Sequence, residues 1–137
     1  MIGILIVSHG AFGEALIHGA SHVLGKRPPR VGQVGVTMHD DPDAVLLRAR
    51  ELVRQLDDGD GVLVFTDILG ATPSNIASRL LSPGRIEGVS GVSLPMLIRA
   101  LTYRSEPLAA VVDKAKSAAR ECTVHIDSES GNAPGAN

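Results

Sequence analysis

The spacing of apolar residues changes repeatedly along the chain, and each change predicts a new secondary-structure element. Runs of apolar, β-branched residues are typical of strands buried on both faces, whereas apolar positions three or four residues apart predict helices. Strands are predicted at residues 1–7, 31–37, 62–66 and 86–92, with a short, alternating edge strand at residues 122–126. Helices are predicted at residues 12–24, 41–56, 72–81, 94–103 and 107–120. The chain therefore alternates between strand and helix over most of its length.

Residues at the predicted helix ends support these boundaries. Gly25 is a suitable stop for the first helix, and it precedes the basic, proline-rich turn of residues 26–30. Asp41 and Thr72 are predicted N-caps, and each is followed by a proline in the first turn. The first helix is expected to bury a stripe of four apolar side chains, namely Phe12, Leu16, Ala20 and Val23.

The alternation of strands and helices predicts an α/β fold with a mostly parallel sheet and helices on both faces. Residues 1–127 should form one domain, because 137 residues leave no room for a second core. Residues 128–137 cannot pack a core and are expected to be a disordered tail. In such sheets ligands bind beyond the carboxyl ends of the strands, so functional residues should directly follow the strands.

Composition and charge exclude several classes of protein. Thirteen basic and fifteen acidic side chains give a net charge of -2, which argues against a dedicated nucleic-acid or anionic-membrane binder. Aromatic residues make up 2% of the chain, too few for a platform that stacks bases. The single cysteine excludes an internal disulfide and a cysteine-rich zinc site. No apolar run is long enough to cross a bilayer and no signal peptide is visible, so a soluble cytoplasmic domain is expected.

Two residues that follow strands form a chemically useful pair. His9 comes after the first strand and Asp67 after the third, so their side chains can meet if those strands are neighbours. A carboxylate that accepts a hydrogen bond from the imidazole Nδ1–H fixes the tautomer and leaves a lone pair on Nε2. Such a nitrogen can act as a nucleophile, a general base or a metal ligand. Each residue alone also has a structural interpretation, His9 as a hydrogen-bonded strand end and Asp67 as a turn cap.

The turn after the third strand is a candidate anion site. Gly70, Ala71 and Thr72 offer backbone N–H groups and a hydroxyl at a helix start, which suits a phosphate. Thr72 and Pro73 are also explained as an ordinary helix start without any ligand. A nucleophilic imidazole beside such a turn indicates phosphoryl transfer through a phosphohistidine. Neither the P-loop pattern nor the glycine pattern of dinucleotide-binding proteins occurs, so the phosphate is expected to come from another protein.

Three segments match one known family in their order and spacing. They read Val-Ser-His-Gly at 7–10, Asp-Ile-Leu-Gly-Ala-Thr-Pro-Ser-Asn at 67–75 and Gly-Val-Ser-Leu-Pro-Met-Leu at 91–97. On these segments the chain resembles the IIA component of the mannose-family bacterial sugar phosphotransferase system, over about residues 1–126. The middle segment is the most specific of the three. Small departures occur at Leu69, Ala71 and Ser93, where many members have an aromatic residue, a glycine and an asparagine.

The resemblance implies a fold, an assembly and a site. The fold is a flavodoxin-like, mostly parallel five-stranded sheet whose last strand is antiparallel at the edge, and the assembly is a homodimer that exchanges this strand. His9 would be the phosphorylated residue and Asp67 would orient it, with no metal or other cofactor. The phosphoryl oxygens would be held by the 70–74 turn, namely by Gly70, Ala71, Thr72 and Ser74.

The resemblance also implies partners. The phosphoryl group would arrive from the phosphocarrier HPr and leave for a separate IIB component, since no IIB domain is fused to this chain. Any link to the membrane would be indirect, through a permease. No nucleic acid is implied.

Two other functions fit parts of the same pattern. A tetrapyrrole metal chelatase of the sirohydrochlorin/cobalt type also begins with a buried strand that ends in His-Gly, but it needs a further metal-binding histidine. A regulatory domain would use His9 in the same way, with phosphorylation altering its binding to another protein. A metal-binding assay separates the chelatase from the carrier, whereas the sequence does not separate transport from regulation.

The remaining histidines and the cysteine have weaker claims to function. A stripe of three side chains at four-residue spacing, Glu14, His18 and His22, either holds a metal or is a solvated helix face, and the solvated face is favoured. His39 follows the second strand and can border the cleft. His125 is predicted to be structural or interfacial, and Cys122 is expected to pack as a small apolar residue.

Overall fold

The computed structural model describes residues 1–128, which form a four-stranded parallel sheet and five helices. The strands are β1 (Gly3–His9), β2 (Val31–Val36), β3 (Val62–Thr66) and β4 (Ile86–Ser90). The helices are α1 (Phe12–Leu24), α2 (Pro42–Leu56), α3 (Thr72–Ser78), α4 (Leu94–Thr102) and α5 (Leu108–Glu121). The strand order β2-β1-β3-β4 places β1 beside β3 at the centre of the sheet.

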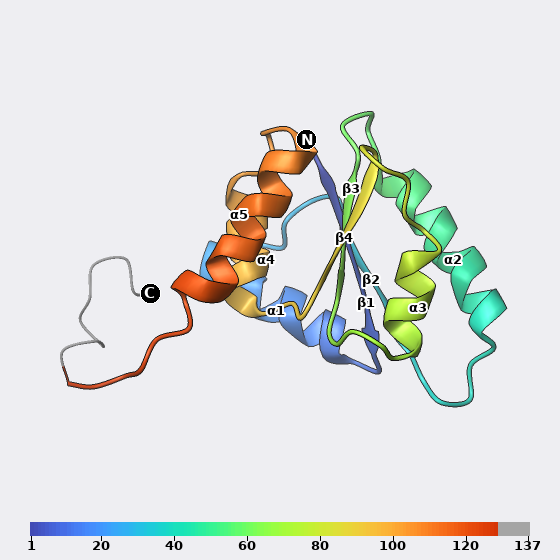
Figure 1. Ribbon diagram of the computed structural model, residues 1–137, viewed down its shortest axis with the longest axis horizontal. Coiled ribbons are helices and arrows are strands. Elements are labelled where there is room, and N and C mark those ends of the chain that lie inside the picture. The colour runs from blue at the N-terminus through green and yellow to red at the C-terminus, as the bar shows by residue number, and fades with distance from the viewer. Residues whose placement is uncertain (129–137) are drawn as a thin grey trace.

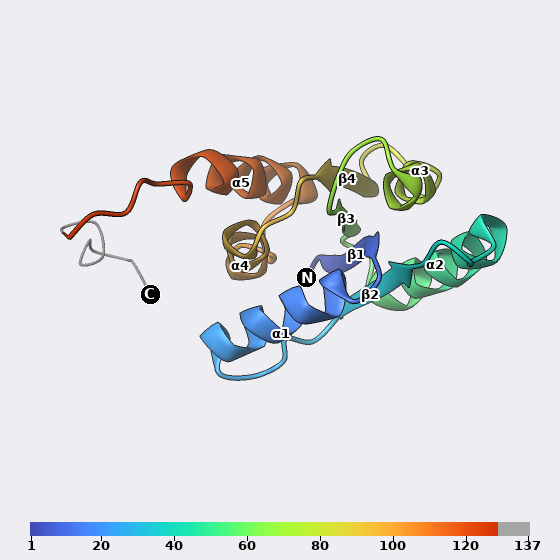
Figure 2. The same ribbon diagram turned by 90° about the horizontal axis from the view of Figure 1, so that it is seen from below.

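The helices cover both faces of the sheet (Figure 1). Helices α1, α4 and α5 pack on one face, and α2 and α3 pack on the other, as the turned view also shows (Figure 2). Alternate residues of β1 serve the two sides, since Ile4 and Ile6 join the first layer and Leu5 and Val7 the second. Burial on both faces explains why β1 and β3 read as continuous apolar runs.

The prediction of a fifth, antiparallel strand is wrong, because the described sheet has four strands and all of them are parallel. Residues 123–127 follow α5 without regular secondary structure, and Val124 and Ile126 are 63% and 79% exposed. Alternating apolar residues give a segment strand propensity, but a strand also needs a neighbouring edge that completes its hydrogen bonds. In this chain the segment runs away from the sheet (Figure 1), so no such edge is within its reach. The expected tail at 128–137 lies outside the described residues, apart from the exposed Ser128.

The stripe predicted for α1 is also wrong in part. Phe12 and Val23 are 41% and 51% exposed, and the buried residues of the helix are Gly13, Ile17 and Ala20. The first turn of α1 packs so closely on β1 and β2 that a Cβ atom at Gly13 would lie 3.0 Å from Ser8 Oγ. The smallest side chain, rather than the largest, therefore faces the sheet at this point.

Smaller boundary differences concern α3 and its neighbours. Helix α3 ends at Ser78 instead of Leu81, and the strand predicted to reach residue 92 ends at Ser90. The stop at Gly25 is confirmed, because this residue adopts the left-handed conformation at the end of α1. None of the helices within residues 1–128 is both long and apolar enough to cross a membrane.

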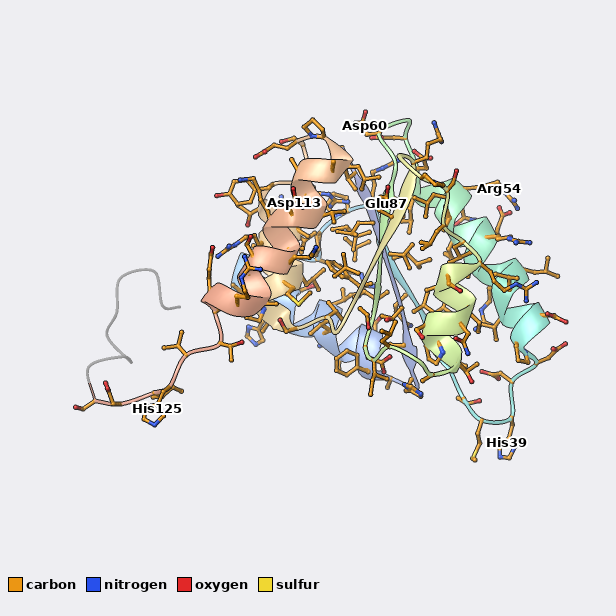
Figure 3. All side chains as sticks on the ribbon, in the orientation of Figure 1. His39, Arg54, Asp60, Glu87, Asp113 and His125 are labelled. Atoms are coloured by element: carbon orange, nitrogen blue, oxygen red, sulfur yellow. The ribbon has the colours of Figure 1, made fainter. Side chains whose placement is uncertain are left out.

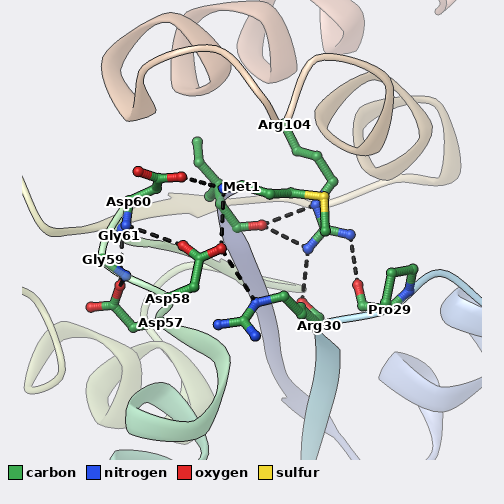
Figure 4. A network of polar contacts seen from close by, with 10 residues as sticks. Met1, Pro29, Arg30, Asp57, Asp58, Gly59, Asp60, Gly61 and Arg104 are labelled. Atoms are coloured by element: carbon green, nitrogen blue, oxygen red, sulfur yellow. Dashed lines mark hydrogen bonds and ion pairs between the residues drawn. The ribbon is translucent and has the colours of Figure 1, made fainter.

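The amino ends of the strands are held together by a polar network (Figure 4). The buried guanidinium of Arg104 donates four hydrogen bonds, at 2.6–3.0 Å, to the carbonyl oxygens of Ile2, Pro29 and Arg30. The terminal ammonium group of Met1 pairs with Asp58 and Asp60 at the same end of the sheet. These contacts tie the starts of β1 and β2 to the loop between α4 and α5, at the end opposite to His9.

Candidate functional site

The side chains of His9 and Asp67 meet at the carboxyl ends of the two central strands. Val7 of β1 pairs with Thr66 of β3, so the residues that follow them emerge at one edge of the sheet. The Nδ1 atom of His9 lies 2.8 Å from Oδ2 of Asp67. The backbone N–H of His9 donates to the same oxygen at 3.0 Å, and the backbone N–H of Ile68 donates to Oδ1 at 3.0 Å. Both carboxylate oxygens are therefore fixed, and the ring of His9 is held from one side.

The electrostatics of Asp67 determine which nitrogen of His9 carries a proton. Partial burial acts to raise the pKa of the Asp67 carboxyl, but the hydrogen bonds from the backbone and the ring of His9 outweigh it, so this pKa lies below its ordinary value. At neutral pH Asp67 is thus an anion that can only accept hydrogen bonds. Nδ1 of His9 must then be the donor, and the neutral ring keeps its lone pair on Nε2. The His9 side chain is 53% exposed, so this lone pair is available to a partner.

A close approach between two backbone segments shapes the turn directly after His9. Gly10 has a φ of +51°, and its N–H donates to the carbonyl of Val36 at 2.9 Å. A Cβ atom at Gly35 would lie 2.1 Å from the carbonyl oxygen of Gly10. The neighbouring strand β2 can run this close to the turn only because residue 35 is a glycine. The sequence gives no sign of this contact beyond the glycine itself.

The turn at residues 70–74 is held by the hydroxyl of Ser74. This hydroxyl accepts the backbone N–H of Gly70 at 2.8 Å and donates to the carbonyl of Ala71 at 3.0 Å. Ser74 is 8% exposed and Gly70 has a φ of +85°, which a residue with a side chain rarely adopts. Ser74 and the N–H of Gly70 are thus used within the turn itself.

The predicted cap at Thr72 is not observed. The N-cap of α3 is Ala71, no side chain caps this helix, and Thr72 is its first residue. The Thr72 hydroxyl is exposed, and the first N–H groups of α3 have no carbonyl partners within the helix, as at any helix start. Of the four residues predicted to bind phosphate, Thr72 is thus exposed at the first position of α3, whereas Ala71, the N-cap, is half-buried.

Exposed apolar side chains follow three of the strands at this end of the molecule. They are Phe12, Met38, Ile68 and Leu69, which are 41%, 91%, 57% and 78% exposed. Sequence reasoning placed Phe12 in the core and gave the other three no role. Their positions close after the strands were the available signal.

A groove lies behind the turn, between α3 and β4, with a volume of about 190 Å³. We refer to it as the α3–β4 groove; its lining residues are Thr66, Leu69, Ser74, Ala77, Ser78, Leu81, Gly88, Val89 and Ser90. The hydroxyl of Thr66 is buried and has no hydrogen-bond partner among the described residues. Leu69 and Ser74 belong both to the groove and to the turn that carries the candidate site.

The other predicted candidates lie apart from His9. Glu14 forms an ion pair with Arg27 at 2.8 Å, and His18 and His22 are exposed on α1. His39 points outward at the tip of the loop between β2 and α2, and His125 lies beyond α5 (Figure 3). Cys122 is exposed instead of packed. Within residues 1–128, no three His, Cys, Asp or Glu side chains come together in a way that could hold a metal ion.

Comparisons with known proteins point in one direction. The family model described as PTS system fructose IIA component matches residues 3–116. The mannose-specific EIIAB component of Escherichia coli K12 is 30% identical over 106 residues, which cover 77% of this chain and 32% of that protein. The fructose-specific EIIA component of Bacillus subtilis 168 is 26% identical over 105 residues, covering 76% of this chain and 71% of the relative.

A solved structure agrees with these sequence matches. The crystal structure of a phosphotransferase system component EIIA from Streptococcus agalactiae superposes with a TM-score of 0.81 and 29% identity, covering 91% of this chain and 97% of the other. The chain spans about a third of the length of the mannose-specific relative. The chelatase alternative gains no support from these matches.

Proposed function

The chain belongs to the family of phosphotransferase-system fructose IIA components, and we propose from this premise that it is a phosphohistidine carrier that is phosphorylated on His9. The observation that carries the proposal is the exposed His9 ring, whose Nδ1 atom lies 2.8 Å from the Asp67 carboxylate. This contact leaves the Nε2 lone pair directed away from Asp67 and open to a donor. The proposed carrier domain comprises residues 1–127.

The proposed reaction is an in-line transfer between two imidazoles. The Nε2 lone pair of His9 attacks the phosphorus of a phosphohistidine on the donor protein, and the N–P bond of the donor breaks. The electron pair of that bond returns to the donor imidazole, which leaves as a neutral ring because its other nitrogen carries a proton, and the Nδ1 proton of His9 stays in place. Phosphorylation leaves positive charge on the His9 ring, which the Asp67 anion stabilises. Because donor and acceptor are both phosphoimidazoles, the transfer should be nearly balanced in free energy and reversible.

We propose that the 70–74 turn receives the phosphoryl oxygens. The N–H groups of Ala71 and Thr72 at the start of α3, with the hydroxyl of the exposed Thr72, suit an anion there. Gly70 and Ser74 would contribute indirectly, by holding the turn in shape through their 2.8 Å hydrogen bond. No cofactor enters this scheme.

The proposed donor is the phosphocarrier HPr and the proposed acceptor is a separate IIB component. Exposed apolar residues that follow β2 and β3, among them Met38 and Leu69, favour a protein partner over a small phosphorylated molecule. Both exchanges would take place in the cytoplasm, with a permease as the indirect link to the membrane. A purely regulatory use of the phosphorylated state would differ only in the second step.

We also propose that the protein is a homodimer in which residues 122–126 of each copy pair with the other copy. Strand β4 pairs with β3 on one side, and within residues 1–128 its other edge is paired only at Ile86, by a bridge to Ser82, so the rest of that edge is open. The apolar side chains of Val124 and Ile126 are exposed in the single chain, where they gain no burial. An extended segment and an open strand edge on two copies satisfy each other.

The carrier function is tested by phosphorylation with HPr, enzyme I and phosphoenolpyruvate. Wild-type protein should acquire an acid-labile phosphoryl group, and His9→Ala should acquire none. His22→Ala is the matched control, since His22 is exposed in the last turn of α1 and should be dispensable. Acid-labile phosphorylation of the His9→Ala protein, or none of the wild type, would refute the proposal.

A further inference from the structure

We propose that a pocket at the amino ends of the strands binds a small organic anion, namely a carboxylate with an apolar body. The pocket lies at the C-terminal ends of α1 and α4 and has a volume of about 380 Å³, within the range of small-molecule sites. We call it the amino-end pocket; it is lined by Met1, Leu24, Lys26, Leu101, Thr102 and Arg104 and by two prolines. His9 lies at the opposite end of the sheet, so the inference does not depend on the carrier function.

Most of the wall of the amino-end pocket is apolar. Leu24 and Met1 are 42% and 38% exposed, and Leu101 is buried beside them. The two prolines, Pro28 and Pro29, belong to the turn that follows α1, and a proline has no N–H that could bind an acceptor. The apolar body of a ligand in this pocket would bury the exposed surface of Leu24 and Met1, which lowers the free energy of the complex.

Three side chains in the wall carry hydrogen-bond donors, namely Lys26, Thr102 and Arg104. The hydroxyl of Thr102 already donates to the carbonyl of Ile98 at 2.8 Å. The guanidinium of Arg104 has five N–H groups, and its four hydrogen bonds to carbonyl oxygens (Figure 4) leave one N–H, on Nη1. Lys26 is exposed and forms no ion pair within residues 1–128. The donors that remain for a ligand are thus one ammonium group and one guanidinium N–H.

Both of these donors are positively charged, and neither is paired with a carboxylate in the part of the chain that the structure describes. Arg104 is 6% exposed and donates to carbonyl oxygens alone. The terminal ammonium group of Met1 is a third positive charge, but it is already paired with Asp58 and Asp60. Burial, together with the charge of Arg30, lowers the pKa of Arg104. An anion in the pocket would therefore stabilise the charged guanidinium.

The two remaining donors fit a head group with a single negative charge. A carboxylate has two oxygens, which can accept from the Lys26 ammonium and from the Arg104 N–H. A phosphate monoester brings nearly two negative charges and three acceptor oxygens at neutral pH, more than these donors satisfy. The apolar wall selects against anions without an apolar body, such as acetate. A carboxylate with a chain of about eight carbons, such as octanoate, meets both requirements.

The first experiment titrates the full chain with octanoate, below the concentration at which octanoate forms micelles. Calorimetry should show saturable binding of one octanoate per chain. Nuclear magnetic resonance should show shifts of the amides of Leu24, Leu101 and Arg104, and none at His9. Three probes separate charge from apolar body: 1-octanol should bind about fivefold more weakly, and acetate and octylamine should show no saturable binding.

The variant Lys26→Met removes the ammonium group from the wall. Octanoate should bind about fivefold more weakly to this variant, whereas the affinity for 1-octanol should stay within about twofold of the wild-type value. The matched control is Arg27→Met, because Arg27 is the adjacent cation, lies outside the wall and is paired with Glu14 at 2.8 Å. Its affinity for octanoate should equal that of the wild type.

A second variant tests the apolar wall. Leu24→Glu places a carboxylate beside the ligand, so saturable binding of octanoate should be lost through repulsion between like charges. Val23→Glu is the matched control, since Val23 is the preceding residue of α1, is 51% exposed and lies outside the wall. It should bind octanoate like the wild type. Circular dichroism should show the wild-type fold for both variants, because both positions are exposed.

The outcomes decide the inference without reference to phosphoryl transfer. Saturable binding of octanoate that is weakened by Lys26→Met and lost in Leu24→Glu supports it. Equal affinities for octanoate and 1-octanol, an unchanged affinity in Lys26→Met, amide shifts outside the amino-end pocket, or no saturable binding overturn it. Phosphorylation of His9 is measured separately by the HPr assay, so failure of the carrier function and failure of this inference are distinguishable.

Discussion

Asp67 restrains His9 through two different groups, and this double contact determines what a substitution should do. One carboxylate oxygen accepts both the backbone N–H and the ring Nδ1–H of His9, at 3.0 and 2.8 Å. An asparagine has nearly the same shape, but it carries no charge and has one acceptor oxygen in place of two. The change therefore removes electrostatic stabilisation of the phosphorylated ring and leaves a donor facing a donor.

We expect Asp67→Asn to slow phosphoryl acceptance from HPr on the order of a hundredfold, with the fold retained. The rate is measured by rapid quench of the acid-labile phosphoryl group, and the fold by circular dichroism. Asp57→Asn is the matched control, because Asp57 also accepts a backbone N–H, that of Gly59 at 2.8 Å, but lies before β3, at the opposite end of the sheet. Equal rates for Asp67→Asn and wild type would show that Asp67 is not the positioning residue.

The pH dependence of stability offers an independent test of the same carboxylate. The folded-state pKa of Asp67 is lowered, so its ionised form stabilises the folded protein above the unfolded pKa of about 3.9, and this contribution is lost as pH falls through the folded pKa. The difference in the free energy of unfolding between wild type and Asp67→Asn should therefore be constant from about pH 5 to 8 and shrink below about pH 4. Urea unfolding at a series of pH values measures it. A difference that grows toward acid pH would contradict the assignment.

At the scale of elements, β2 supports the site by running close beneath the turn at Gly10. A methyl group at Gly35 would lie 2.1 Å from the carbonyl oxygen of Gly10 and must displace it. Gly35→Ala should therefore destabilise the protein by about 1–3 kcal/mol and also slow phosphorylation of His9, since the displaced turn carries that residue.

Gly32→Ala in the same strand is the matched control for Gly35→Ala. A Cβ atom there would meet Leu56 Cδ1 at 3.5 Å, an ordinary contact, so stability and rate should stay near those of the wild type. Denaturant unfolding and the HPr assay measure both quantities. If the two alanine variants behave alike, the close approach at Gly35 does not shape the site.

The comparison of elements shows what the apolar pattern can predict. The four strands up to residue 90 and the five helices lie close to the predicted places, because each buries a continuous run or a helical stripe within the same chain. The segment at 122–126 also alternates like a strand, but residues 123–127 form no strand, because no neighbouring edge lies along the chain's own path there. The local pattern reports strand propensity, and a strand forms only where a neighbouring edge completes its hydrogen bonds.

The candidate site can likewise be predicted from the sequence only in part. The positions of His9 at the end of β1 and of Asp67 directly after β3 are visible in the sequence, and parallel pairing of β1 with β3 then brings them together. The bonds of the Ser74 hydroxyl depend instead on the φ and ψ angles of the turn, which the sequence does not encode locally. For this reason Thr72 was expected to cap α3, whereas the cap position belongs to Ala71.

At the scale of the whole molecule, the two ends of the sheet have different tasks. The carboxyl ends carry His9 and Asp67, with His9 half exposed and apolar side chains open to partners around it. The amino ends are closed by Arg104, whose buried guanidinium donates to three carbonyl oxygens in the segments directly before β1 and β2. Burial lowers the pKa of Arg104, but a guanidinium stays protonated at neutral pH. The buried positive charge of Arg104 is thus stabilised largely by carbonyl dipoles.

This division predicts that stability and phosphoryl transfer can be changed separately. Arg104→Met keeps an unbranched apolar stem but leaves the carbonyl oxygens of Ile2, Pro29 and Arg30 without these donors, so the free energy of unfolding should fall by about 2–4 kcal/mol. Because Arg104 lies at the opposite end from His9, the folded fraction should accept phosphate within about twofold of the wild-type rate. Urea unfolding and the HPr assay at 25 °C, on the same preparation, measure the two effects.

Lys26→Met is the control for loss of a positive charge at the same end, and it should change neither the free energy of unfolding nor the transfer rate. A fall in the transfer rate of fully folded Arg104→Met protein would mean that the amino ends of the strands also position His9, and the separation of tasks along the sheet would not hold.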